Sequence, residues 1–84
     1  MRVTFKLYAM LSDYLPDEAR KTNSVALDVP PGRTVGQVID EFNLPQKLVH
    51  LVLVNGNYVP PAERAGRALA EGDVLAVWPP IAGG

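Results

Sequence analysis

The residues of this chain with the clearest chemical potential are its last two, Gly83 and Gly84. Because glycine has no side chain, a Gly-Gly end presents its carboxylate on a slender segment that can enter a narrow active site. Such a segment adds little to packing, since glycine loses more backbone freedom on folding than any other residue. A frayed chain end is the alternative interpretation of the same dipeptide. The upstream sequence must therefore decide between the two.

Few other side chains offer catalytic chemistry. The chain has no cysteine and one histidine, His50, which excludes disulfides, a thiolate nucleophile and a histidine metal cage within one chain. With no serine or cysteine nucleophile nearby, His50 is interpreted as an ordinary strand residue. Arg64 and Arg67, which have glutamates close by, are interpreted as solvated surface charges; the alternative is that they orient an acidic partner. We expect no metal site and no bound cofactor.

Size and composition bound the possible functions. The 84 residues make one domain, and 48% apolar residues suffice for one core. Eight Lys and Arg against nine Asp and Glu give a net charge of −1, which argues against nucleic acid or an anionic membrane as the main partner. No apolar run approaches the roughly 20 residues of a spanning helix. The alternating start predicts a strand and not a signal peptide, so we expect a cytoplasmic protein.

The first part of the chain predicts two strands. Apolar and polar residues alternate over residues 3–8 and again over residues 24–29, as a half-buried strand requires. Between them, residues 10–15 predict a short turn of helix with two buried leucines. The charged residues 17–23 predict an exposed loop.

One amphipathic helix follows. From Val35 to Phe42, apolar residues recur at i, i+3, i+4 and i+7, which is the stripe of a helix that lies on a sheet. Thr34 is the expected N-cap. Asn43 and Pro45 are expected to end the helix.

The remaining residues predict three more strands. Residues 49–54 form an apolar run, and Asn55-Gly56 is a strong signal for a type I′ hairpin turn into a short return strand over residues 57–59. An irregular segment with Leu69 as its buried residue leads to the last strand, residues 74–78. In that strand we expect Leu75 and Val77 to face the core, which leaves Trp78 on the open face; the alternative is that Trp78 fills the edge of the core.

These elements together predict an α+β fold. Two hairpins that flank a helix give a mixed sheet of four to five strands packed on one main helix, with the first and last strands parallel at the centre. This is the β-grasp, or ubiquitin-like, arrangement. We expect a single β-grasp domain over residues 1–84, with a flexible C-terminal tail over residues 79–84.

With these features the chain resembles the MoaD/ThiS family, the sulfur-carrier branch of the ubiquitin-like proteins. The similarity runs over nearly the full length and includes Thr34, Asn55-Gly56, Leu69 and the Gly72-Asp73 turn. It is most specific at the end, where Pro-Pro, Ile, Ala and Gly-Gly follow a strand. That ending is similar to the one of the molybdopterin synthase small subunit. Thiamine-type carriers are usually shorter and commonly lack the paired prolines.

The resemblance implies a sulfur carrier for molybdenum or tungsten cofactor synthesis. An E1-like adenylating enzyme would use ATP to adenylate the carboxylate of Gly84, and a sulfur nucleophile would displace AMP to leave a thiocarboxylate. The sulfur would then pass to a pterin precursor on the large catalytic subunit of molybdopterin synthase, with which the chain would form a heterotetramer. The chain is in this view a co-substrate without catalytic side chains of its own.

The tail residues divide into two groups by role. Gly83 and Gly84 would enter the active site of each enzyme, and the paired prolines would stiffen the exit from the sheet. The expected partner-binding residues are Trp78, Pro79, Pro80, Ile81 and Ala82.

Other functions stay open at this point. The same tail would serve a carrier for thiamine or cysteine synthesis, or a protein modifier that forms an isopeptide bond with a lysine. A ubiquitin-like binding domain with an inert tail is the third alternative. Only the inert domain predicts that loss of Gly83 and Gly84 is harmless.

Overall fold

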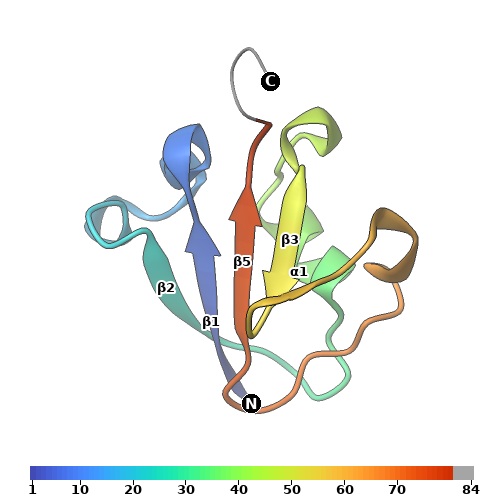
Figure 1. The fold of residues 1–84 in the computed structure, drawn as a ribbon. Helices are drawn as coiled ribbons and strands as arrows, with labels where there is room; N and C mark the ends of the chain where they lie inside the picture. The colour runs from blue at the N-terminus through green and yellow to red at the C-terminus, as the bar shows by residue number, and fades with distance from the viewer. Residues whose placement is uncertain (81–84) are drawn as a thin grey trace.

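The last strand of the chain lies in the middle of the sheet, next to the first (Figure 1). The computed structural model describes residues 1–80. The strands are β1 (Arg2–Leu7), β2 (Ser24–Asp28), β3 (Leu51–Val54), β4 (Asn57–Tyr58) and β5 (Val74–Trp78), and the α-helix is α1 (Val35–Glu41). Four short 3-10 helices are η1 (Ala9–Tyr14), η2 (Asp17–Ala19), η3 (Gln46–Leu48) and η4 (Pro61–Glu63).

The strand order is β2-β1-β5-β3-β4. β1 and β5 pair in parallel, from Thr4 opposite Val74 to Leu7 opposite Val77. The other pairs are antiparallel. This arrangement, with one main helix against a mixed sheet, confirms the predicted β-grasp and its central parallel pair.

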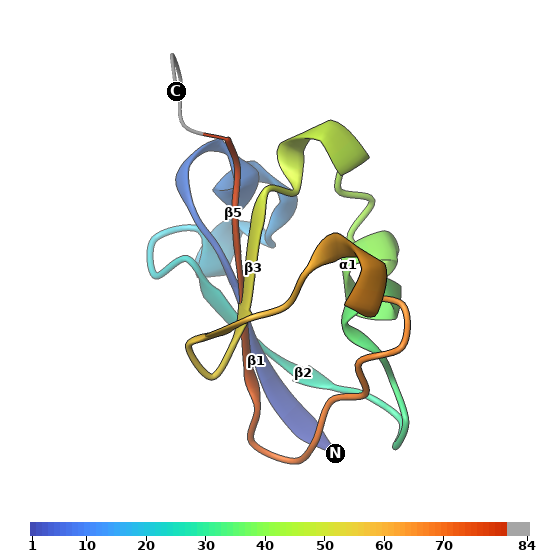
Figure 2. The same ribbon diagram turned by 45° about the vertical axis from the view of Figure 1, so that its right-hand side comes forward.

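The core lies between the sheet and α1. Alternate residues of the strands point toward the helix, because successive side chains of a strand face opposite sides. Leu75 and Val77 are fully buried, so the prediction that they face the core is confirmed. Figure 2 shows α1 and η4 on the same side of the sheet, and the described helices leave the other side of β3 and β5 uncovered. The core residues from the central strands and α1 are Val3, Phe5, Leu7, Val52, Val54, Leu75, Val77, Val35, Val38 and Ile39.

A capping box starts α1. The Thr34 hydroxyl accepts a hydrogen bond from the backbone N–H of Gln37 (3.2 Å), and the Gln37 side chain accepts one from the backbone N–H of Thr34 (2.9 Å). The first bond confirms the predicted cap, and the second supplies a partner that the sequence analysis did not identify. The chain turns after the helix at Asn43, whose φ of +58° is left-handed.

The Asn55-Gly56 turn joins β3 to β4 and also contacts the start of β5. Asn55 has a φ of +52° and Gly56 one of +83°, as a type I′ turn requires, so the predicted hairpin is confirmed. The side chain of Asn55 accepts a hydrogen bond from the backbone N–H of Val74 and donates one to the carboxylate of Asp73, each at 2.9 Å. These bonds hold the start of β5 against the β3–β4 hairpin.

Arg64 corrects the sequence analysis. Its side chain is buried, with the whole residue 9% exposed, whereas a solvated surface charge was expected. Its Nε donates to the carbonyl of Val59 (3.0 Å) and its Nη2 to the carbonyl of His50 (3.2 Å). The segment around η4 has no apolar periodicity, so nothing in its pattern indicated that Arg64 points inward. Arg67 is exposed, as predicted.

The charged segment before β2 also contains more structure than expected. It includes η2, and Ala19 at the end of η2 is buried. Arg20 holds η2 against η1, because its guanidinium donates to the carbonyls of Leu15 (3.1 Å) and Asp13 (2.9 Å). Within residues 1–80, no helix has the length and apolar character needed to cross a membrane.

The capping box gives a first testable prediction. Replacing Thr34 by Ala removes the side-chain acceptor for the N–H of Gln37 and should lower the free energy of unfolding by about 1 kcal/mol. Thr34→Ser keeps the hydroxyl and should stay close to the parent protein. Urea unfolding followed by far-UV circular dichroism measures both. Equal stability of the alanine and serine variants would contradict the role of the cap.

Candidate functional site

The segment that leads into the tail is fixed from both sides at the centre of the sheet. β5 lies between β1 and β3, and its last two residues each accept a hydrogen bond from a neighbouring segment. The backbone N–H of Tyr8 donates to the carbonyl of Val77 (3.2 Å), and the N–H of His50 donates to that of Trp78 (3.1 Å). The chain therefore leaves the sheet from a defined position at one end of the molecule (Figure 1).

An aromatic pair lies where the tail begins. The rings of Tyr8 and Trp78 are stacked, with centroids 3.9 Å apart and planes inclined by 7°. Trp78 is 39% exposed, which confirms its predicted place on the open face. Tyr8 was not identified as a site residue from the sequence. The sequence did contain one indication of its exposure: the alternation of the first strand places Tyr8 on the same face as Thr4 and Lys6.

Apolar side chains extend from this pair across the uncovered side of the sheet. Strand pairing places Leu51 opposite Trp78, and Leu53 opposite both Ala76 and Tyr58. Directly opposed residues share a face of the sheet. We define the open face as Lys6, Tyr8, Leu51, Leu53, Tyr58, Ala76 and Trp78. Large exposed apolar surfaces of this kind often mark protein interaction sites.

Two further apolar side chains are exposed near the beginning of the tail. Met10 and Tyr14 belong to η1, which Figure 1 shows at the same end of the sheet as the end of β5. Met10 is 57% exposed and Tyr14 37%. Together with Tyr58 and Trp78 they are the large exposed apolar residues of the described chain, residues 1–80. Three of these four lie at the end from which the tail leaves.

The predicted tail residues differ in their surroundings. Pro79 is buried and Pro80 is exposed, so Pro80 is open to a partner and the Pro79 ring packs within the domain. Pro79 fixes its own φ, which keeps the backbone extended after β5. The predictions for Ile81, Ala82, Gly83 and Gly84 concern residues outside the described part of the chain.

Other candidate chemistry is limited in the described residues. Over residues 1–80, His, Cys, Asp and Glu side chains form no group of three or more that could hold a metal ion. The contacts of His50 at this site are made by its backbone: its N–H donates a hydrogen bond to the carbonyl of Trp78, and its carbonyl accepts one from Arg64.

Comparison with known proteins places this geometry in context. The model of the ThiS family matches residues 14–84, which is most of the chain and includes both terminal glycines. The search of curated proteins found no match.

Several solved structures share the fold. The crystal structure of SAMP1 from Haloferax volcanii is 28% identical with a TM-score of 0.68, and the match covers all of both chains. A putative molybdopterin converting factor, subunit 1, from Pyrococcus furiosus is 21% identical with a TM-score of 0.67, over 95% of this chain and 98% of that one. The small archaeal modifier protein 1 from Methanosarcina acetivorans is 24% identical with a TM-score of 0.64, over 99% and 96% of the two chains. The last two, below 25% identity, support the fold alone.

The stacked pair gives a second testable prediction. Trp78 is the sole tryptophan of the chain, so its fluorescence reports directly on the stack. Replacing Tyr8 by Ala should increase the quenching of Trp78 by acrylamide and lower the free energy of unfolding by about 0.5–1.5 kcal/mol. Tyr8→Phe keeps the ring and should retain the parent values. Unchanged quenching in the alanine variant would show that Tyr8 does not cover Trp78.

Proposed function

Because the chain belongs to the ThiS family, we propose that it is a ubiquitin-like sulfur carrier that works through the carboxylate of Gly84. The domain presents its tail to other enzymes and acts as their co-substrate. This role needs a free carboxylate at Gly84 and a rigid domain behind it. The carrier needs no catalytic side chains of its own for this role.

The proposed reaction activates a carboxylate that is otherwise a poor acyl donor. An oxygen of the Gly84 carboxylate attacks the α-phosphate of ATP in an E1-like adenylating enzyme, and pyrophosphate leaves. A hydrosulfide ion then attacks the acyl carbon of the adenylate, and AMP leaves with the oxygen that joined it to the acyl group. The product is a thiocarboxylate at Gly84. Fixing sulfur to the carrier raises its effective concentration wherever the domain docks.

One observation supports the proposal most directly. The match to the ThiS family runs through Gly84, and hydrogen bonds from Tyr8 and His50 hold the last two residues of β5, directly before the tail, at the centre of the sheet. A tail fixed at its base loses less conformational freedom when it enters a partner's active site. The buried Pro79 adds to this, because it restricts the first residue after β5.

The open face is the proposed docking surface for the enzymes that act on the tail. Its apolar side chains and the Tyr8–Trp78 stack lie beside the point where the tail begins, so a partner bound there lies next to the start of the tail. Stacked aromatic residues that are partly exposed are frequent centres of binding energy in interfaces.

For the pathway, we propose molybdopterin synthesis. The ending from Pro79 to Gly84 resembles that of the molybdopterin synthase small subunit, which supports this choice over thiamine or cysteine synthesis. The partner is then the large catalytic subunit of the synthase, in a heterotetramer, and the thiocarboxylate sulfur passes to a pterin precursor. The pathway for molybdenum or tungsten uses the same chemistry at this step.

A protein modifier is the second candidate function. The similarity to SAMP1 from Haloferax volcanii supports it, as does the similarity to the structure of H. volcanii small archaeal modifier protein 1. The adenylated Gly84 would then react with a lysine amine to form an isopeptide bond. Both functions share the activation step and differ only in the nucleophile.

Mass spectrometry of the protein isolated from its own host separates these functions. A carrier should show a fraction with the mass increase of one oxygen-to-sulfur exchange at Gly84. A modifier should instead appear as conjugates joined through Gly84 to lysines of other proteins. Deletion of Gly83 and Gly84 should abolish either product, and pyrophosphate release by the activating enzyme, without changing the unfolding midpoint. Retention of cofactor synthesis by the deletion variant would exclude the carrier function, and persistence of the conjugates would exclude the modifier function.

Docking through the open face gives a separate prediction. Replacing Trp78 by Ala should weaken binding to the activating enzyme by about tenfold or more, because partly exposed aromatic residues dominate many interfaces. Lys21→Ala, in the exposed segment before β2, is the matched surface control and should bind like the parent protein. Isothermal titration with both variants measures the effect. Equal affinities for the two variants would place the docking surface elsewhere.

A further inference from the structure

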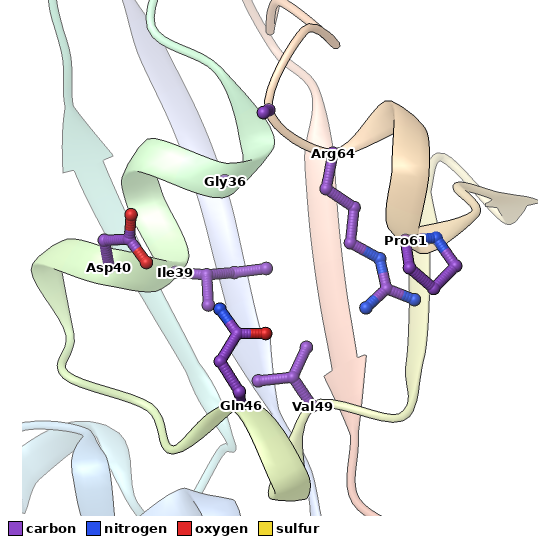
Figure 3. A pocket seen from close by; sticks show the side chains of 8 residues that line it. Gly36, Ile39, Asp40, Gln46, Val49, Pro61 and Arg64 are labelled. Atoms are coloured by element: carbon purple, nitrogen blue, oxygen red, sulfur yellow. The ribbon is translucent and has the colours of Figure 1, made fainter.

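A pocket of about 180 Å³ lies on the side of the molecule opposite the open face, between α1 and the segments around η3 and η4. Gly36, Ile39 and Asp40 of α1 line one side, and Gln46, Pro61 and Arg64 line the other (Figure 3). Figure 3 shows the Arg64 side chain passing Pro61, with its guanidinium on the side of the pocket away from Asp40. Neither the tail chemistry nor the open face uses this pocket.

The guanidinium of Arg64 has donor capacity left over. Its Nε and Nη2 donate to the carbonyls of Val59 and His50. Among residues 1–80, Nη1 makes no hydrogen bond, and every fully buried side-chain nitrogen or oxygen atom has a partner. Nη1 is therefore not fully buried, and Arg64 is one of the residues that line the pocket.

The charge of Arg64 is also unpaired in the described chain. The ion pairs of residues 1–80 involve Arg2, Arg20 and Arg33, and no carboxylate lies within 4.0 Å of the Arg64 guanidinium. A buried cation without a counter-ion is unusual, because taking a charge out of water is costly unless an opposite charge accompanies it. An incoming carboxylate would supply that counter-ion and accept charge-assisted hydrogen bonds from Nη1.

We propose that this pocket binds the carboxylate of an aspartate or glutamate side chain from a protein partner. Its volume is below the roughly 300–1,000 Å³ of ordinary small-molecule sites, so it fits a single side chain. Ile39 and Pro61 offer apolar contacts for the methylene groups of such a side chain. Because the pocket and the open face lie on opposite sides of the sheet, the acidic partner can bind while an enzyme holds the tail (Figure 2).

Neutralising Asp40 tests whether the ligand of the pocket is negatively charged. Its exposed carboxylate lines the opposite side of the pocket and repels an anion there. Replacing Asp40 by Asn should therefore tighten the binding of a carboxylate, by about two- to fivefold, as for the loss of one exposed charge. The same substitution would weaken the binding of a cation.

The experiment is an NMR titration of the full chain labelled with ¹⁵N, with N-acetyl-glutamate methylamide as the probe. The isosteric N-acetyl-glutamine methylamide is the neutral control. The signals to follow are the Arg64 Nε–H and the backbone amides of Gly36 and Ala65, which line the pocket. We expect saturable shifts of these signals with the glutamate compound alone, and tighter binding to the Asp40→Asn variant.

Three results would overturn the proposal: no saturable shift, equal shifts with both compounds, or weaker binding to Asp40→Asn. Arg64→Gln should abolish the response, but it also removes two hydrogen bonds of the fold. The Asp40 variant changes only an exposed side chain, so it tests the pocket even where Arg64→Gln does not fold. None of these measurements involves the tail, and their outcome is thus distinguishable from a failure of the proposed sulfur chemistry.

Discussion

The parallel pairing of β1 with β5 is the constraint on which the rest of the structure depends. It joins the first and last strands of the described chain, so the sheet is complete only when nearly the whole sequence has folded. The pairing also places β5 between β1 and β3, where both edges of the strand are hydrogen-bonded. Burial of Leu75 and Val77 and the defined position of the end of β5 follow from that central placement.

The sheet separates two surfaces of different character. The open face is mostly apolar, with the Tyr8–Trp78 stack where β5 ends and the tail begins. The helix side carries the pocket beside α1 that Arg64 lines. Arg64 also connects the two sides through His50, whose carbonyl accepts from the guanidinium and whose N–H binds Trp78. A single arginine thus supports both the pocket wall and the end of β5.

Regular patterns in the sequence predicted the fold well, and irregular segments did not reveal their contacts. Alternation identified the strands around Phe5 and Leu27, and Thr34 and Asn55 marked the helix start and the hairpin, because each signal is local. Arg64 was misassigned because its buried side chain is held by the carbonyls of Val59 and His50, five and 14 residues earlier, and no local pattern indicates these contacts. Tyr8 was missed for the same reason, since its partner Trp78 lies at the far end of the chain.

The central position of β5 has a mechanical consequence. An enzyme that draws the tail into its active site pulls along the axis of β5, and the hydrogen bonds to β1 and β3 run across that axis. The pull therefore loads these bonds in shear, so that they share the force instead of breaking one after another. An edge strand under the same pull would have neighbours on one side only. Its central position therefore makes β5 more resistant to such a pull than an edge strand would be.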